Sequence, residues 1–262
     1  MAGKRAICRD VHFYHFAEPE RELGGMILSP SVTEKNFLSM LAILIVASGP
    51  YRVTSRNTGE DLAPTDNFAI AITDEPCVIR ILSRTITGRD DAFRNQVRQR
   101  DGKCVITGLV NTQAYRDRWT GFEATHIFPL SSEEYFVQSG FIRWITNRRD
   151  EHDTGINSAQ NGLLMQNSVH ALFDDFGFAV NPDDGYKITS FDGDPFGIDG
   201  KILDPVCRDP SDDQSARNEL LRWHFRQAVL ANMRGVGEPS FETDFPPGTD
   251  MMGEILKRTG CS

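Results

Sequence analysis

The sequence has little cysteine and no long hydrophobic run. Its five cysteines are widely spaced and include no Cys-x-x-Cys pair, which predicts reduced thiols rather than a disulfide framework or a zinc knuckle. The longest apolar stretch, Met40 to Ala47, is less than half of the roughly 20 residues that cross a bilayer. The first residues lack the apolar core of a secretory signal. These absences predict an intracellular protein, cytoplasmic or nuclear, with no membrane partner.

The sequence also has fewer basic than acidic residues. There are 28 Lys and Arg residues against 37 Asp and Glu residues, so the formal net charge is −9. This sign is wrong for a protein that coats a phosphate backbone unaided, and any contact with nucleic acid must be local. The 39% hydrophobic and 25% charged residues are nevertheless typical of an ordinary folded protein.

The chain divides into three stretches, and their expected elements together predict an α+β fold. Residues 1–88 read as a small N-terminal α/β unit, and residues 89–200 contain a module of strands and short helices. Residues 201–262 contain a long helix from Ala216 to Met233, which Gly235 ends, and then a proline-containing extended arm.

In the first stretch, Ser31 and Glu34 fit a capping box at the start of a helix, because a hydroxyl and a carboxylate three residues apart can bond to free helix amides. The sequence predicts that this helix ends at Gly49-Pro50. Three runs of β-forming residues follow as expected strands: Tyr51 to Ser55, Phe68 to Ile72 and Cys77 to Leu82.

The second stretch opens with an expected helix from Asp90 to Gly102, with Phe93 and Val97 facing inward. Expected strands follow at residues 103–107 and 121–128, and a hairpin is expected around Pro182 to Gly185, between strands 178–181 and 186–191. The helix and its end carry the clearest basic group of the chain, whose members are candidate substrate-binding residues: Arg94, Arg98, Arg100 and Lys103.

Three polar residues are the candidate catalytic group: His126, Asn161 and His170. His126 ends an apolar strand and is followed within three residues by Pro129, which stops the strand pairing. Asn161 and Gly162 form an expected turn, and His170 lies in a short helix that starts at Asn167 or Ser168. We expect the three side chains to converge on one point, where a base and a cation can act together on a phosphodiester.

With these residues, the sequence resembles the HNH family, whose ββα-metal module frames one divalent cation between two antiparallel strands and a helix. The resemblance includes the segment from Arg100 to Gly108 and the Leu172-Phe173-Asp174 motif. It is similar to the HNH variant common in fungal proteins, for which the likeness continues into residues 181–184 and 221–227.

The resemblance implies a role for each of the three residues. His126 matches the general base that takes a proton from water, Asn161 matches the residue that fixes the loop and orients the first His or the metal shell, and His170 matches a metal ligand or a phosphate contact. The implied cofactor is Mg²⁺ or Mn²⁺, with Zn²⁺ as an alternative, and the implied partner is DNA.

The sequence departs from the family pattern at Thr125, where many HNH nucleases have Asp. A neutral hydroxyl is a poor ligand for a hard cation, so metal binding depends on other groups. Glu123, on the same strand face as Thr125, and Asp174, one helical turn after His170, are the candidate substitutes, which makes the expected metal ligands His170, Asn161, Glu123 and Asp174.

The long segment between His126 and Asn161 is a second departure. It interleaves aromatic residues with arginines, so Trp144 is a candidate substrate-binding residue that stacks on a base. Alternatively, Phe136, Phe141 and Trp144 pack a helix against the module. His152 is a weaker candidate as a further nitrogen ligand for zinc.

Three functions remain open from the sequence. The first is a metal-dependent endonuclease that hydrolyses DNA with His126 as the base. The second is a repurposed HNH scaffold that acts as a metal-independent, pericyclase-type cyclase on a small apolar metabolite of fungal secondary metabolism, which requires an apolar cleft near 300 Å³ or larger. The third is a noncatalytic module in which the N-terminal unit recruits a partner protein.

Overall fold

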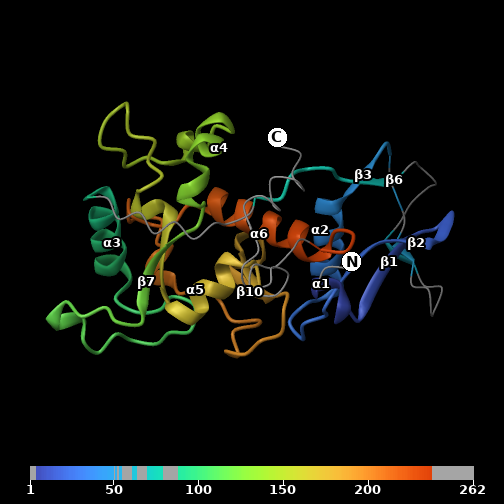
Figure 1. Cartoon of the computed structure of the whole chain (residues 1–262), viewed down its shortest axis with the longest axis horizontal. Coiled ribbons are helices and arrows are strands. Elements are labelled where there is room, and N and C mark those ends of the chain that lie inside the picture. The colour runs from blue at the N-terminus through green and yellow to red at the C-terminus, as the bar shows by residue number, and fades with distance from the viewer. Residues whose placement is uncertain are drawn as a thin grey trace, which may run out of the picture.

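The computed structural model describes residues 4–49, 51, 53–54, 61–63, 70–78 and 88–237. The molecule is elongated, with the N-terminal unit at one end and the segment from residue 88 onward filling the rest (Figure 1). The proline-containing tail expected as an extended arm lies outside the described residues.

The N-terminal unit consists of short helices and paired strands. Its helices are α1 (Lys4–Ile7) and α2 (Glu34–Leu44), and its strands are β1 (Val11–His15), β2 (Glu18–Met26), β3 (Ile45–Ala47), β4 (Val53–Thr54), β5 (Asp61–Ala63) and β6 (Ile70–Ile72). The described strands pair antiparallel as β1–β2, β3–β6 and β4–β5. The β1–β2 hairpin was not predicted, because the first half of β2 is charged and exposed and shows no apolar alternation.

The predicted boundaries of the first helix are wrong at both ends. Thr33, not Ser31, is the N-cap, and Asn36 completes the capping box, while the Ser31 hydroxyl donates instead to Asp199, 2.8 Å away. The helix ends at Leu44 rather than at Gly49, because the residues from Ile45 leave the helix to pair with β6 as a strand.

The expected strands after this helix are partly confirmed. Strands β4 and β6 lie within the first and second expected runs, but Arg52, Ser55 and residues 68–69 lie outside the described residues. Residues 73–78 form no strand, and residues 79–82 also lie outside the described part.

Beyond residue 88, the helices are α3 (Gly88–Asp101), α4 (Glu133–Gln138), α5 (Asn167–Asp174) and α6 (Asn218–Met233), and the strands are β7 (Phe122–His126), β8 (Gly162–Gln166), β9 (Phe178–Asn181) and β10 (Lys187–Ser190). Single 3-10 turns lie between them: η1 (Ala114–Arg116), η2 (Leu130–Ser132), η3 (Phe141–Trp144), η4 (Ala159–Asn161), η5 (Pro182–Asp184) and η6 (Pro205–Cys207). The β9–β10 hairpin, α5 and α6 are as predicted, and antiparallel strand pairs mixed with helices make the fold α+β.

The strand expected at residues 103–107 is wrong. Only Lys103 makes a bridge, to Val110, and the chain then turns back so that the Gly108 amide donates to the Cys104 carbonyl at 2.9 Å. Gly108 supports this tight turn with a φ of 82°, a conformation that costs glycine little. The expected turn at Asn161 and Gly162 is also different, because Asn161 ends η4 and Gly162 begins β8.

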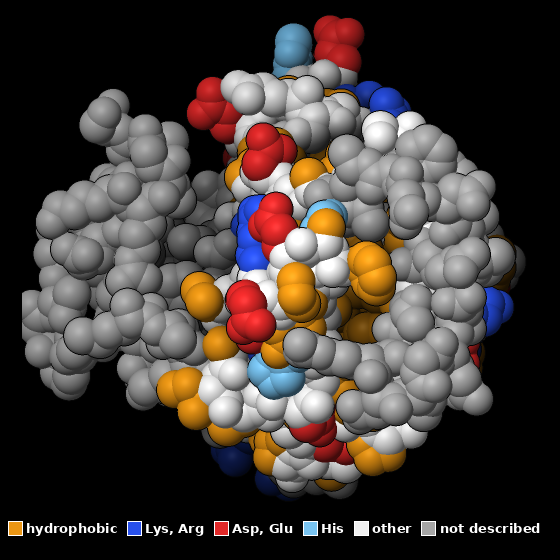
Figure 2. Space-filling model, turned by 90° about the vertical axis from the view of Figure 1, so that its right-hand side faces the viewer, with side chains coloured by type: hydrophobic (Ala, Val, Ile, Leu, Met, Phe, Trp, Pro, Cys, Tyr) orange, Lys and Arg blue, Asp and Glu red, His pale blue; other side chains and the backbone are white. Residues whose placement is uncertain are grey.

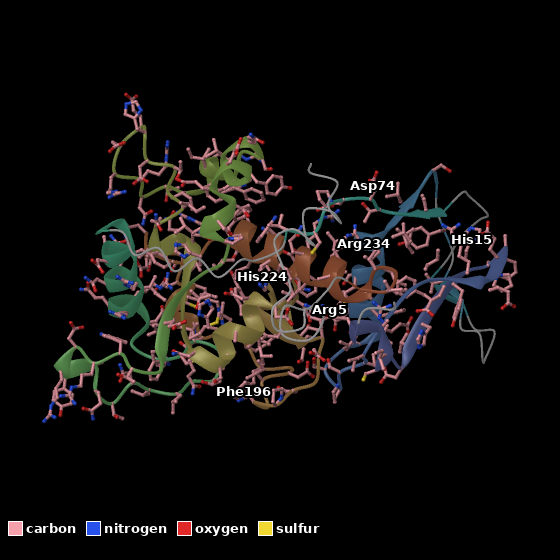
Figure 3. All side chains as sticks on the ribbon, viewed as in Figure 1. Arg5, His15, Asp74, Phe196, His224 and Arg234 are labelled. Carbon is pink, nitrogen blue, oxygen red and sulfur yellow. The ribbon has the colours of Figure 1, made fainter. Side chains whose placement is uncertain are left out.

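Helix α6 belongs to two hydrophobic cores. Its first half, with Leu220, Leu221 and Trp223, packs with the residues of β8, α5 and β9, and its second half, from Phe225 to Met233, packs with Met26 and α2. His224, at the centre of the molecule (Figure 3), stacks on Phe173 of α5 with ring centroids 3.6 Å apart. The predicted divisions at residues 88 and 200 remain a prediction.

Two buried arginines attach the N-terminal unit to the end of α6. The Arg9 guanidinium donates to the carbonyl oxygens of Asn232 and Gly235. Arg5, which lies beside this end of the helix in Figure 3, donates to the Asn232 side chain at 2.8 Å and to Asp175. The bond from Arg9 to the Asn232 carbonyl satisfies a group that the end of α6 leaves without an intrahelical partner.

The four cysteines in the described part of the chain are free thiols, as predicted. No helix within the described ranges is both long and apolar enough to cross a membrane.

Candidate active site

The candidate site is built on the β7–β8 ribbon and α5. The two strands pair antiparallel, with His126 opposite Gly162 and Glu123 opposite Met165. Helix α5 starts directly after β8 and carries His170 in its second turn. This order of two strands and a helix is the ββα arrangement that the resemblance to the HNH family implied, although no strand was predicted at Gly162–Gln166.

Asn161 clamps the loop that follows His126. Its Oδ1 accepts from the Phe128 amide at 2.7 Å, and its Nδ2 donates to the carbonyl oxygens of Phe128 at 3.0 Å and Ile156 at 2.9 Å. The side chain is fully buried. Asn161 therefore fixes the loop, one of its two expected roles, but this structure gives no support for Asn161 as a metal ligand, because its polar atoms are bonded to the backbone inside the protein.

His126 is held on the face of the ribbon that packs against α3. Its ring stacks on Phe93 of α3, with centroids 4.0 Å apart and planes at 9°. Its Nε2 lies 3.0 Å from Oδ1 of Asn157. This stack and this polar contact both hold the ring.

His170 is held on the opposite face between two carboxylates. Its Nδ1 lies 2.5 Å from Oε2 of Glu123, and its Nε2 lies 3.0 Å from Oδ2 of Asp174. Burial lowers the pKa of His170, but the hydrogen bonds and charges of Asp174 and Glu123 outweigh burial and raise this pKa to about 9. The hydrogen bond from His170 in turn lowers the pKa of Glu123, against the effect of burial. The ring is therefore an imidazolium at neutral pH, and both of its N–H groups donate.

The expected convergence of the three side chains does not occur. Successive residues of a strand point to opposite faces, and the contacts show which face is which. Ala124 and His126 lie toward Phe93 and Val97 of α3, whereas Glu123 lies toward His170 of α5. The two histidines are on opposite faces of the ribbon, and Asn161 is bonded to the loop between them.

The residues as arranged do not fit the divalent cation that the resemblance implies. Within the described residues, no group of three or more His, Cys, Asp or Glu side chains could hold a metal ion. Glu123 and Asp174 are suitable ligand types, but they bind the two nitrogens on opposite sides of one ring. Thr125 is 1% exposed and its hydroxyl has no hydrogen-bond partner in the described structure. We therefore derive no chemical step through a metal.

The basic residues expected to bind substrate differ in how far they are available. Arg100 is not available to a substrate, contrary to the prediction, because its side chain is buried. It donates to Asp101 and to the carbonyl oxygens of Ala159, Gly162 and Gln214. Lys103 is paired with Asp204, with 2.6 Å between Nζ and Oδ2, and Arg94 is paired with Asp91. Arg98 lies over the Trp119 ring, 5.0 Å from its centroid.

The segment between His126 and Asn161 mainly packs against the module. Phe136 is fully buried and Phe141 packs near it, as the packing alternative predicted. Trp144 is 37% exposed and lies outside α4, with the Arg143 guanidinium over its ring. The side chain of His152 is 90% exposed and its nearest acidic partner is Glu151, so the geometry gives no support for His152 as a zinc ligand.

Two residues of the site were missed from the sequence. Asn157 lies in a loop four residues before Asn161, and a polar loop residue carries no signal of its role as the partner of His126. Asp101 joins α3 to β8, because its carboxylate accepts from the Leu164 amide at 2.8 Å and from Arg100. The Arg100-Asp101 pair stood in the motif, but its burial does not follow from sequence spacing.

Comparison with known proteins identifies two regions of the chain. Residues 104–181 match the family of HNH endonucleases, and residues 8–69 match a domain of unknown function (DUF8573). No curated protein and no solved structure matches the chain. The HNH match contains β7, β8 and α5, and with them His126, Asn161 and His170. This chain therefore contains a domain of the HNH endonuclease family.

Proposed function

We propose that this chain is a nuclease that hydrolyses phosphodiester bonds in DNA, with His126 as the general base. The family match supports the reaction class, and the local geometry supports the choice of base. The observation that carries the proposal is the Asn161 clamp, whose three hydrogen bonds fix the loop directly after His126. A general base must be held within hydrogen-bond reach of the proton that it removes.

The contacts of His126 fix the state of one ring nitrogen. The Oδ1 atom of Asn157 can only accept, so the Nε2 atom that faces it carries a proton. The stack on Phe93 keeps the ring in one orientation and leaves it few alternative rotamers.

The small-molecule alternative gains no support from the described structure. The cavity lined by Arg5, Cys8 and Phe191 has a volume of about 40 Å³, far below the roughly 300 Å³ at which pockets for metabolites begin. It also lies at the end of α6 and away from His126.

Nicking of supercoiled plasmid DNA by the purified full-length protein tests the proposal. The reaction is run with Mg²⁺, with Mn²⁺ and with EDTA, and the protein is compared with His126→Ala. Loss of a general base lowers the rate by about 10²- to 10⁴-fold. His152→Ala is the matched control, because His152 is an exposed loop histidine of the same domain. Absence of nicking under all three conditions, or equal nicking by His126→Ala, contradicts the proposal.

A further inference from the structure

A loop between α3 and β7 extends from the end of the molecule opposite the N-terminal unit (Figure 1). We name residues 108–120 the basic arm. It contains Arg116, Arg118 and a single acidic residue, Asp117. In a chain with a net charge of −9, such a local excess of positive charge is the kind of feature through which an acidic protein can still contact phosphates.

The basic arm is held in a defined shape. Asn111 is 8% exposed, and its side chain donates to the Arg118 carbonyl at 2.8 Å and accepts from the Gln113 amide at 3.0 Å. The first bond joins the two sides of the arm, and the second closes a turn on one side. A preformed surface loses less entropy on binding than a loop that must first become ordered.

The base of the arm is attached to α3. Trp119 lies under the Arg98 guanidinium, and its indole N–H donates to Asp117 at 2.8 Å. Trp119 also packs against the small cluster of Phe93 and Val97. The arm is therefore anchored on the same helix whose Phe93 stacks on His126.

The tip of the arm presents an aromatic ring and two cations. Tyr115 is 75% exposed, and the Arg116 guanidinium lies 5.1 Å from its ring centroid. Arg116 and Arg118 are exposed, and no carboxylate lies within ion-pair distance of either in the described part of the chain. An exposed aromatic ring beside arginines is the combination of groups with which proteins stack unpaired bases and contact phosphates.

We propose that the basic arm binds an unpaired stretch of nucleic acid, with one base stacked on Tyr115 and with Arg116 and Arg118 on the neighbouring phosphates. The faces of bases are covered in a duplex, so an exposed ring of this kind stacks on an unpaired base. The inference rests on the proposed function: β7 runs from the arm to His126 over about 13 Å, so a strand bound at the arm is held within a few nucleotides of the proposed base.

The opposite end of the molecule provides a natural comparison. Phe16 is 94% exposed on the β1–β2 hairpin, but its neighbours on β2 include Glu18, Glu20 and Glu22. Arg21, on the same hairpin, is paired with Glu18 at 3.2 Å. Acidic side chains are spread over this end of the molecule (Figure 2), so it lacks the charge that favours phosphate.

Fluorescence anisotropy with a labelled single-stranded oligodeoxynucleotide tests the inference, in the presence of EDTA to suppress metal-dependent cleavage. Tyr115→Ala should bind about 5- to 150-fold more weakly, because it removes one base-aromatic stack. Tyr115→Trp, which keeps a stacking face, should bind like the unmodified protein. Phe16→Ala and Arg21→Ala are the matched controls and should leave the affinity unchanged.

The salt dependence of binding tests the role of the arginines separately from that of Tyr115. Arg118→Ala should lower the slope of log K against log salt concentration by about 0.7, the value for one phosphate contact on a single strand. A duplex of the same sequence should bind more weakly and be insensitive to Tyr115→Ala. Equal binding of the single strand by Tyr115→Ala and the unmodified protein, or an equal loss for both kinds of DNA, overturns the inference.

The two proposals fail in distinguishable ways. Plasmid nicking by the protein together with unchanged binding by Tyr115→Ala removes the role of the basic arm and leaves the nuclease. Single-strand binding that depends on Tyr115, without nicking under any condition, removes the nuclease and leaves the binding surface.

Discussion

The Nδ1 atom of His170 lies 2.5 Å from Oε2 of Glu123, and this contact joins the helix of the HNH domain to its first strand. Asp174 holds the other ring nitrogen at 3.0 Å. An imidazole that donates from both nitrogens is protonated. The protonated His170 ring thus donates to both carboxylates that the sequence predicted as substitute metal ligands.

The Glu123–His170 pair should make stability depend on pH. The pKa of His170 is raised from 6.5 to about 9, so its contribution is complete below pH 6.5 and is lost as the pH rises through 9. The pKa of Glu123 is lowered from 4.5, so its contribution is present above pH 4.5 and is lost as the pH falls. The unfolding free energy from this pair is therefore greatest between about pH 4.5 and 6.5, as urea denaturation across pH can measure.

Glu123→Gln tests the same pair directly. Removal of one carboxylate should lower the pKa of His170, followed by NMR titration of its ring protons, and should cost on the order of 1 kcal/mol at neutral pH because Glu123 is half exposed. Glu134→Gln is the control, since the exposed Glu134 carboxylate on α4 accepts a hydrogen bond from the exposed Gln138. An unchanged titration of His170 in Glu123→Gln is inconsistent with the pair.

Asn161 should behave as a structural clamp rather than a ligand. Asn161→Ala removes three buried hydrogen bonds and should lower the unfolding free energy by about 3 kcal/mol. Asn161→Asp should be at least as destabilising, because a carboxylate cannot donate to the Phe128 and Ile156 carbonyl groups. Chemical denaturation measures both, with the exposed Asn95→Ala on α3 as control. Full stability of Asn161→Asp would instead favour a ligand role.

Thr125 should tolerate the loss of its hydroxyl. Its Oγ1 is buried without a partner among the described residues, so Thr125→Val should leave the unfolding free energy unchanged or raise it by up to about 1 kcal/mol. Thr107→Val is the matched control and should be destabilised, because the Thr107 hydroxyl bonds to Gln166 at 2.7 Å. A large loss of plasmid nicking in Thr125→Val, at unchanged stability, would show that the hydroxyl serves the reaction.

Much of the secondary structure in the HNH domain could be predicted because local signals agree there. The Pro-Asp-Asp-Gly turn and the short helix of His170 each depend on nearby residues, as does the apolar spacing of α6 after the domain. Strand β8 was missed and the strand predicted at residues 103–107 is wrong. The secondary structure of the N-terminal unit was harder to predict. Ser31 has the chemistry of a cap, but Asp199, far away in the sequence, takes its hydroxyl. The β1–β2 hairpin lacks an apolar alternation because only the end of β2 is buried.

In the candidate site, too, the features set by nearby residues could be predicted and those set by distant contacts could not. Strand spacing predicted that Glu123 and Thr125 share a face, and helix spacing predicted that Asp174 lies next to His170, as the 3.0 Å contact confirms. Arg100 was misjudged, because a charged residue on a helix is usually solvated. Its burial depends on carbonyl groups of Ala159 and Gln214, which the fold brings to it from more than fifty residues away.

The sequence by itself determined β7, with His126 at its end, and α5, with His170 within it, because these elements follow from local spacing and turn chemistry. The second strand, β8, was not predicted, and the order of two strands and a helix was implied only by the resemblance to the HNH family. Only the tertiary structure decided which way the side chains face. The packing of α3 on one face of the ribbon and α5 on the other separates the two histidines. That packing arises from long-range burial of apolar surface, which no local pattern specifies.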